Sequence, residues 1–398
     1  DNDTLMISKG RLDCSPLLLT PNTTVVYGFM WIDLKEGPIV IEAPPGVLGL
    51  VDNFWFKYVT DIGMAGEDKG AGGKYLLLPP DSDMKPPGFF LRKSQTYGNW
   101  FVIRGFMPHG LDPSAVLTNW KDGLRIYRHG ASPRAPDMVN CVGKGINTIH
   151  RTDAGFFDEL NELVQEEPNA AGDPEILGVL KTIGIEKGKA FEPDVRMQKI
   201  LADAAAVGTA ACRSILFRSR EDFAAYPGSK TWEIGFPAGS YEFRRDGVSL
   251  IDQRLRFHYF ATGITPAMIV EMVGVGSQYM MGIRDSNGLP FDGAKAYKLN
   301  LPPNVPAKMF WEITLYDNQT RSELQTDRPY PAITSLMDIV LEPDGSCNVF
   351  FGPEKPPGTE TNWIQTVPGK GWNMLWRLYG PLKPWFEKTW RPGEIVLL

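Results

Sequence analysis

The sequence has few cysteines, no long apolar run and no cluster of basic residues. Its four cysteines are widely separated and none forms a CxxC pair, so neither a zinc site nor a dense disulfide framework is indicated. No stretch approaches the roughly 20 uninterrupted apolar residues of a membrane-spanning helix, so we expect no transmembrane span. A net charge of −6 without any basic run argues against nucleic acid as a partner.

The common catalytic signatures are also missing from the sequence. It contains no GxGxxG after a predicted strand, no GxxxxGK[ST], no GxSxG and no HExxH, which argues against dinucleotide-binding, nucleotide-binding, α/β-hydrolase and zincin classes. The four histidines are far apart, and none has a second metal ligand two or four positions away. A metal held by distant residues stays an alternative, and the identity of any cofactor is left open.

In other respects the composition is that of a folded globular protein rich in turn residues. With 398 residues, the chain exceeds the usual size of one hydrophobic core, so we expect two or three domains. Apolar residues make up 43% and charged residues 22%, which is close to the globular average. The 33 prolines and 41 glycines lie in scattered turn-like dipeptides, which favours many short strands over a helical bundle.

The outer parts of the sequence differ in pattern from the middle. Short runs of β-branched and aromatic residues alternate with Pro and Gly clusters at both ends, whereas Phe156, Leu160 and Val164 recur at helical spacing. We therefore predict a mainly β fold with an α insert and two sandwich-like or jelly-roll-like domains. The predicted parts are an N-terminal β-sandwich over 1–148, a helical insert over 149–226 and a C-terminal β-domain over 227–398.

The segment that starts at His150 is the first candidate for chemistry. An acidic helix is predicted directly behind this histidine, so a carboxylate such as Glu159 could orient the imidazole for general acid–base catalysis. The alternative is structural, with Asp153 capping the helix and the glutamates facing solvent near the positive end of the helix dipole. Both interpretations stay open at this point.

A second polar cluster runs from Tyr316 to Ser322, at the end of a strand that is predicted to be buried. Asp317 and Arg321 could form a carboxylate–arginine pair that binds a polar substrate. An Asx-type turn with a surface ion pair explains the same residues equally well. The pattern therefore marks a candidate anion-binding or substrate-binding point without deciding between the two.

Aromatic residues close to polar ones form the third signal. Trp and Tyr at strand edges can line a pocket for an apolar or aromatic small molecule, although core packing explains most residues of this kind. The predicted substrate-binding residues are Asn22, Tyr27, Trp55, Tyr97, Trp100, Arg104 and Tyr241. If some of them converge between the domains, a ligand cleft follows.

Two parts of the sequence resemble bacterial families. Pro21–Tyr27 followed by Asp33–Val40 resembles the opening of the domain of unknown function numbered 1254. Four later segments resemble its partner, the domain numbered 1214: Leu315–Asp317, Asn362–Trp363, Arg377–Pro381 and Thr389–Pro392. Together the two resemblances cover nearly the whole chain, and they imply two β-domains with helices between them rather than a settled activity.

The acidic residue of a motif of the first family is absent here. Many members carry the motif Asn-x-Asp-Thr-x-Tyr, and here Thr24 stands where its aspartate would be, so no role of an acidic residue transfers to this position. The resemblance also implies a further helical segment before the motif, often behind a secretion signal, and hence a chain that starts late. It implies a periplasmic or secreted protein, with a cytoplasmic location as the alternative.

Together these observations favour a small-molecule enzyme, a hydrolase, with an aromatic-lined cleft between the two β-domains. In this hypothesis His150 moves protons, Glu159 orients it, and Asp317 with Arg321 completes the catalytic set. The alternative is a non-catalytic periplasmic or envelope-associated binding protein for an apolar or aromatic ligand. We also expect a small-molecule ligand as the partner, and a homo-oligomer is a further possibility.

Overall fold

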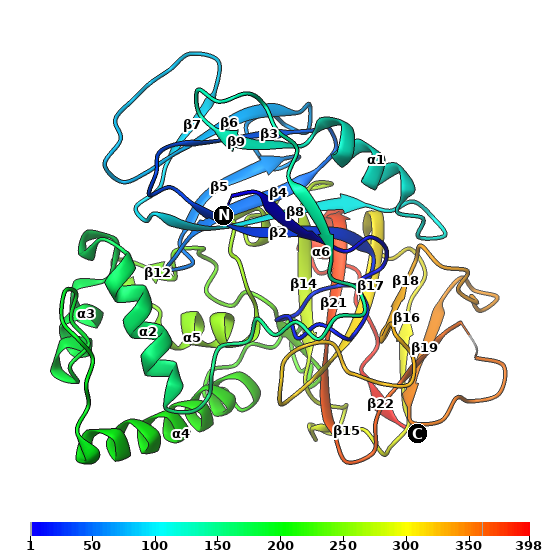
Figure 1. Ribbon diagram of the computed structural model, residues 1–398. Helices are drawn as coiled ribbons and strands as arrows, with labels where there is room; N and C mark the ends of the chain where they lie inside the picture. The colour runs from blue at the N-terminus through cyan, green and yellow to red at the C-terminus, as the bar shows by residue number, and fades with distance from the viewer. Residues whose placement is uncertain (1, 360) are drawn as a thin grey trace.

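The structure is a computed structural model that describes residues 2–359 and 361–398. It is mainly β, as the sequence predicts, with two β-sandwiches and most of the helices between them in the chain. Figure 1 shows the N-terminal sandwich in blue and cyan above the strands of the C-terminal one, with the green helices α2, α3 and α4 to one side.

The N-terminal sandwich packs a six-stranded sheet against a four-stranded one. In spatial order the larger sheet contains β10 (Asp137–Asn140), β1 (Thr4–Ile7), β2 (Val25–Asp33), β8 (Gly98–Phe106), β4 (Leu48–Asn53) and β5 (Tyr58–Gly63). The smaller sheet contains β7 (Phe90–Lys93), β6 (Gly73–Leu78), β3 (Ile39–Ala43) and β9 (Arg125–Arg128). Helix α1 (Ser114–Gly123) adds the fully buried Trp120 to the core between them.

Alternation along β2 decides which of its residues enter this core. Val26 and Ile32 point between the two sheets and are fully buried. Gly28 lies on the same side, where a Cβ atom would stand 2.9 Å from the indole of Trp120, so the glycine makes room for this ring. Tyr27 therefore points to the opposite face of the sheet, the one that is turned toward the C-terminal domain.

Most of the helical structure follows this sandwich in the chain. It comprises α2 (Gly155–Glu166), the short η1 (Asn169–Ala171), α3 (Pro174–Thr182) and α4 (Val195–Phe217). The side chain of Asp173 caps α3 by accepting a hydrogen bond from the N–H of Glu175 at 3.0 Å. Val164, Leu180 and Ile185 form a small core of their own. These helices thus pack as a separate arm beside the sandwiches.

Helix α4 is mostly exposed. Among the described residues it is the one helix whose length and composition would let it cross a membrane, and 11% of its most apolar 18-residue stretch is buried. Arg196, Lys199, Asp203 and Arg213 interrupt its sequence. The absence of a transmembrane span, which the sequence led us to expect, stays a prediction.

The C-terminal sandwich repeats the pairing of a large sheet with a small one. Its larger sheet contains β11 (Trp232–Ile234), β14 (Ser277–Gly282), β21 (Gly371–Pro381), β17 (Ala307–Asp317) and β18 (Ala332–Thr334), with β15 (Phe291–Asp292) beside β21. The smaller sheet contains β20 (Trp363–Gln365), β19 (Cys347–Gly352), β16 (Tyr297–Leu301) and β22 (Val396–Leu397). Trp372 and Trp376 of β21 are fully buried between the sheets.

The remaining elements lie in the connections of this domain. They are the hairpin β12 (Arg244–Arg245) and β13 (Val248–Ser249), helix α5 (Ile251–Phe260), the short η2 (Pro266–Met268) and helix α6 (Lys383–Phe386). The side chain of Thr265 caps η2 by accepting a hydrogen bond from Ala267 N–H at 2.9 Å. The segment that contains α5 and η2 runs between the two sandwiches, where it closes the space described below.

The two larger sheets contact each other through their outer faces. Phe106 of β8 meets the ring of Tyr379 of β21 edge-on, with ring centroids 5.7 Å apart. Val25 packs against Phe310 and Tyr379 in one buried cluster. Because side chains alternate along each strand, the residues two positions from these contacts, Tyr27 and Arg377, also lie on the facing surfaces.

Candidate functional site

A cavity of about 140 Å³ lies between the two larger sheets. This volume is many times the roughly 10–15 Å³ that one water molecule needs. The N-terminal sheet contributes Phe29 and Arg104 to the wall, the C-terminal sheet contributes Tyr279 and Arg377, and helix α5 covers the gap between them with Phe257. Three parts of the chain that are distant in sequence therefore build one cavity.

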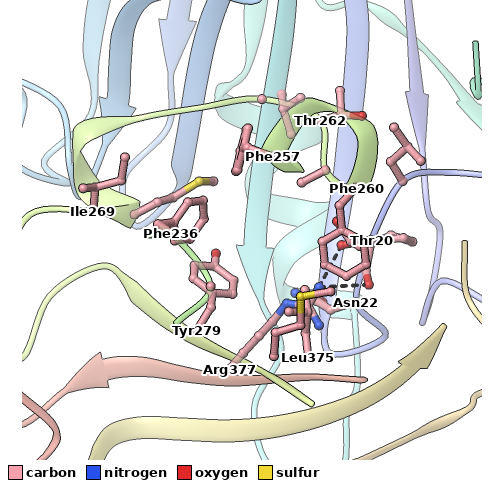
Figure 2. Close-up of a pocket in the computed structure, with 18 of the residues that line it drawn as sticks. Thr20, Asn22, Phe236, Phe257, Phe260, Thr262, Ile269, Tyr279, Leu375 and Arg377 are labelled. Carbon is pink, nitrogen blue, oxygen red and sulfur yellow. Dashed lines mark hydrogen bonds between the residues drawn. The ribbon is translucent and has the colours of Figure 1, made fainter. Parts of the chain in front are cut away.

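Most of the wall is apolar. Figure 2 shows Phe257 and Phe260 of α5 together with Phe236 and Ile269 around the upper part of the cavity. Phe236 and Phe257 are neighbours, with ring centroids 5.2 Å apart. Leu375 extends the apolar surface on the C-terminal sheet. A wall of this kind favours an apolar or aromatic molecule over a polar one.

One end of the cavity is polar, and three tyrosine hydroxyls surround it. The hydroxyl of Tyr27 accepts a hydrogen bond from the N–H of Asn22 at 3.2 Å, and that of Tyr379 accepts one from Asn22 Nδ2 at 2.5 Å. Burial raises the pKa of Tyr27 to about 12 and that of Tyr379 well above its usual value. Both phenols thus keep their protons at neutral pH and face the cavity as donors.

The third hydroxyl, of Tyr279, lies within hydrogen-bonding reach of the side chain of Arg104. It also shares a hydrogen bond of 2.6 Å with Ser277 Oγ. Arg104 is 6% exposed, and its Nε is buried without a hydrogen-bond partner in the described part of the chain. A guanidinium has five N–H donors and does not lose its charge in proteins. The contact with Tyr279 therefore leaves the Nε–H of Arg104 without an acceptor among the described residues.

The second buried arginine of this region is held by the protein itself. Arg377 donates to the backbone carbonyl of Thr20 at 2.7 Å and to Thr314 Oγ1 at 3.3 Å, and the contact with Thr20 appears in Figure 2. Glu312 lies opposite Arg377 on the neighbouring strand β17. Burial lowers the pKa of Arg377, but Tyr316 and Glu312 outweigh it and raise the pKa. Its charge is therefore balanced within the fold.

The structure brings four of the seven predicted substrate-binding residues to the cavity wall: Asn22, Tyr27, Trp100 and Arg104. The other three lie elsewhere. Trp55 packs on the small core of the helical arm, and Tyr97 lies at the edge of the core of the N-terminal sandwich. Tyr241 meets Tyr58 edge-on, with ring centroids 5.4 Å apart. These three residues do not line this cavity.

None of the four predicted catalytic residues is part of the cavity wall. His150 and Arg321 lie near each other, because the ring of Tyr259 is 6.0 Å from His150 and the guanidinium of Arg321 lies 4.1 Å above that same ring. Burial and the charge of Arg321 lower the pKa of His150. Glu159 is exposed on α2, where it accepts a hydrogen bond of 3.5 Å from the N–H of Arg151.

Asp317 and Arg321 lie in one turn but have different partners. Asp317 forms an ion pair of 2.7 Å with Lys370 and accepts a hydrogen bond from the N–H of Gln319. Arg321 donates to the carbonyls of Gln319 at 2.7 Å and Tyr259 at 3.1 Å. The turn with an ion pair, one of the two alternatives from the sequence, is what the structure contains, although the cation is Lys370.

Sequence reasoning missed the residues that the C-terminal half contributes. Tyr279, Arg377 and Tyr379 line the cavity, and so do Phe257 and Phe260 of α5. The spacing of Arg377 and Tyr379, two positions apart on a strand, puts both on one face of the sheet. That face could be recognised as polar from the sequence, but the part of the N-terminal sheet that it meets could not.

Metal ligands do not gather in the described part of the chain. No three His, Cys, Asp or Glu side chains among residues 2–359 and 361–398 are close enough together to hold a metal ion. The four cysteines are free; Cys14, Cys141 and Cys347 are buried, and Cys212 is half-buried. They pack as small apolar side chains.

Two protein-family models match this sequence, one in each sandwich. The model of DUF1254, a protein of unknown function, matches residues 4–128, and that of DUF1214, also a protein of unknown function, matches residues 276–383. The chain belongs to the DUF1254–DUF1214 family. In this member the DUF1254 match covers most of the N-terminal sandwich, the DUF1214 match covers the strands β14 to β21, and α5 lies in the segment between the two matches.

Two solved structures are similar to this DUF1254–DUF1214 protein. The VPA0106 protein from Vibrio parahaemolyticus has a TM-score of 0.56 and 16% sequence identity, with 95% of this chain and 90% of that chain covered. An uncharacterised protein from Burkholderia cenocepacia has a TM-score of 0.47 and 12% identity, with 100% and 82% covered. The first supports the shared fold. No curated protein matches the sequence significantly.

Proposed function

We propose that this protein binds a small, largely apolar molecule in the cavity between its two sandwiches. The observation that carries the proposal is the cavity itself, whose wall combines aromatic and aliphatic side chains with a few converging polar groups at one end. Ligand sites in proteins have this composition, and they occur preferentially between domains. The binding protein that the sequence offers as one of two alternatives fits this site.

The lining favours binding over hydrolysis. Of the described residues that line the cavity, none is His, Cys, Ser, Asp, Glu or Lys. These side chains supply the nucleophile and the general base in most hydrolases. A hydrolase centred on His150 would need its substrate in a different place, so the enzyme stays a hypothesis that this cavity does not support.

Calorimetric titration with a neutral aromatic probe, naphthalene-1-acetamide, tests the proposal. We expect one molecule to bind per chain, and we expect Val102→Trp to abolish binding because Val102 lines the cavity and an indole there would fill it. The matched control is Val207→Trp on the exposed face of α4, where the side chain is 69% exposed. This variant should bind the probe as the parent chain does.

Recovery of the probe separates a binding protein from an enzyme. After repeated additions and long incubation, chromatography should return naphthalene-1-acetamide unchanged and in full, since a binding protein only sequesters its ligand. Equal binding by the parent chain and Val102→Trp, or no binding at all, would show that the cavity does not serve as the binding site.

A further inference from the structure

Among the described residues, Arg104 is the charged group of the cavity wall that has no ion-pair partner, and the inference drawn from it rests on the binding function proposed above. Three arginines line the cavity: Arg104, Arg256 and Arg377. Arg256 forms an ion pair of 2.5 Å with Glu233, and Arg377 has Glu312 opposite it on the neighbouring strand. No ion pair of Arg104 occurs in the described part of the chain, although the residue is 6% exposed.

The nearest acidic influence does not remove this charge. Asp61 lies on β5, on the same face of the N-terminal sheet as Arg104, and its pKa is affected by the arginine. However, Asp61 Oδ2 already accepts a hydrogen bond of 3.3 Å from the hydroxyl of Tyr58. Burial raises the pKa of Asp61 to about 6, so this carboxylate is ionised at pH 7.5, but it forms no ion pair with Arg104 among the described residues. A buried cation that is not paired costs folding energy, so its presence in a cavity wall is typical of a binding site.

The hydrogen-bond donors around Arg104 indicate which chemical group a bound ligand would present to them. The hydroxyls of Tyr27 and Tyr379 accept hydrogen bonds from Asn22, and no acceptor for their own protons is present among the described residues. Arg104 Nε is also without an acceptor. Two phenol O–H groups and the Nε–H of the guanidinium thus converge at one end of the cavity without an acceptor among the described residues. A group that accepts several hydrogen bonds and carries one negative charge satisfies all of them.

We propose that the ligand is an amphipathic monocarboxylate, with its carboxylate bound by Arg104, Tyr27 and Tyr379 and its apolar body packed among the aromatic residues of α5. A single cation without an ion pair among the described residues matches a single negative charge. The two oxygens of a carboxylate provide acceptors for the guanidinium and for the phenols together. Phe257 and Phe260 supply the apolar surface at the other side of the same cavity.

The matched probes are naphthalene-1-acetate and naphthalene-1-acetamide, which have nearly the same shape and differ in charge. Calorimetric titration at pH 7.5 gives the ratio of their affinities. We expect the parent chain to bind the acid about tenfold or more tightly than the amide, because hydrogen bonds to a charged group are the stronger ones. In Arg104→Met the ratio should fall to about one. Arg196→Met on the exposed surface of α4 is the matched control and should keep the ratio of the parent.

Stability of the unliganded variant distinguishes a binding arginine from a structural one. Replacing an unpaired buried charge by an apolar side chain of similar length is neutral or stabilising. Arg104→Met should therefore unfold at the same temperature as the parent or higher. A lower unfolding temperature together with an unchanged affinity ratio would show that Arg104 supports the fold instead, and would overturn the inference.

Tyr27→Phe provides the second measurement if Arg104→Met fails to fold. It removes one O–H donor and should weaken binding of the acid several-fold more than binding of the amide. Equal binding of acid and amide by the parent chain would refute the carboxylate and leave the binding function intact. If neither probe binds, both the inference and the proposed function fail.

Discussion

Asp52 of β4 accepts a hydrogen bond of 2.7 Å from the backbone N–H of Ile264, in the loop that follows α5. Both residues are almost fully buried. The carboxyl group therefore ties the N-terminal sheet to the segment that closes the cavity. Burial raises the pKa of Asp52 to about 8, partly opposed by the Ile264 N–H and reinforced by Asp61.

Stability should fall as pH rises, because the folded chain holds the proton of the Asp52 carboxyl group more tightly than the unfolded chain does. Between the ordinary aspartate pKa of 3.8 and the folded value of about 8, the folded state binds one proton more. The free energy of unfolding then falls by up to about 1.4 kcal/mol per pH unit. The raised pKa of Asp61 also lowers the stability as pH rises, up to about pH 6. The pKa of His258 is lowered to about 4, so this residue raises the stability as pH rises from about 4 to 6.5.

Above pH 6.5 the raised pKa of Asp52 still lowers the stability, and the buried Glu323, whose pKa burial also raises, acts in the same direction. Urea unfolding from pH 6.5 to 8 measures the combined slope, and Asp52→Asn should make the decline shallower because the amide cannot ionise. His258→Asn is a suitable comparison, since it should leave the slope in this range unchanged. The same slope in the parent and in Asp52→Asn would show that Asp52 does not contribute to it.

Thr24→Asp, which restores the common acidic residue of the family motif, should destabilise this chain. Thr24 Oγ1 donates a hydrogen bond of 2.6 Å to Glu312 Oε2, and both residues are fully buried. An aspartate would place a second carboxylate against Glu312, at a cost of about 3–5 kcal/mol. Urea unfolding measures this cost. Adding Glu312→Gln should recover much of the loss, and a fully stable single variant would contradict the prediction.

Asn22 should contribute more to stability than its hydrogen bond to Tyr379 alone. Its Oδ1 accepts from the N–H groups of Thr24 and Val25 at 3.1 and 3.2 Å, and its Nδ2 donates to Tyr379 in the other sandwich. We expect Asn22→Ala to cost about 2–4 kcal/mol and Tyr379→Phe about 1 kcal/mol. A double-mutant cycle in urea then gives the coupling energy between Asn22 and Tyr379. Additive costs would mean that their hydrogen bond contributes no coupling between the sandwiches.

Glu167 should determine whether the helical arm stays attached. It is 1% exposed and accepts hydrogen bonds from the N–H groups of Tyr97 and Gly98 at 2.7 and 2.8 Å. Glu167→Ala leaves both donors without a partner, which costs about 2–4 kcal/mol. Hydrogen exchange over 155–182 should therefore accelerate more than exchange in β21. Glu166→Ala, at the exposed neighbour that pairs with Lys35, is the control and should change exchange little.

The mainly β character of the chain follows from local properties. Runs rich in β-branched and aromatic residues such as Val25–Asp33, and the Pro and Gly dipeptides between such runs, depend only on the neighbouring residues. The helical pattern of Phe156, Leu160 and Val164 is equally local and indicates α2. These features allow the two sandwiches and the helical arm to be predicted without any knowledge of which surfaces meet.

The cavity wall could be predicted from the sequence only in part, and the division follows the two domains. Asn22, Tyr27, Trp100 and Arg104 were recognisable because polar and aromatic residues stand together in the N-terminal strands. Arg377, Tyr379 and the phenylalanines of α5 acquire a role only when the C-terminal sheet and α5 close over them. Their convergence depends on contacts between residues hundreds of positions apart, and periodicity carries no information about such contacts.

The sequence by itself determined the β-rich double-domain fold, since strand and helix patterns are short-range. Tertiary structure alone decided that Asp317 pairs with Lys370, that His150 lies outside the cavity wall, and that Arg104 is buried without an ion-pair partner among the described residues. The physical reason is that burial and charge pairing are properties of the space around a side chain. That space forms only when distant segments pack together.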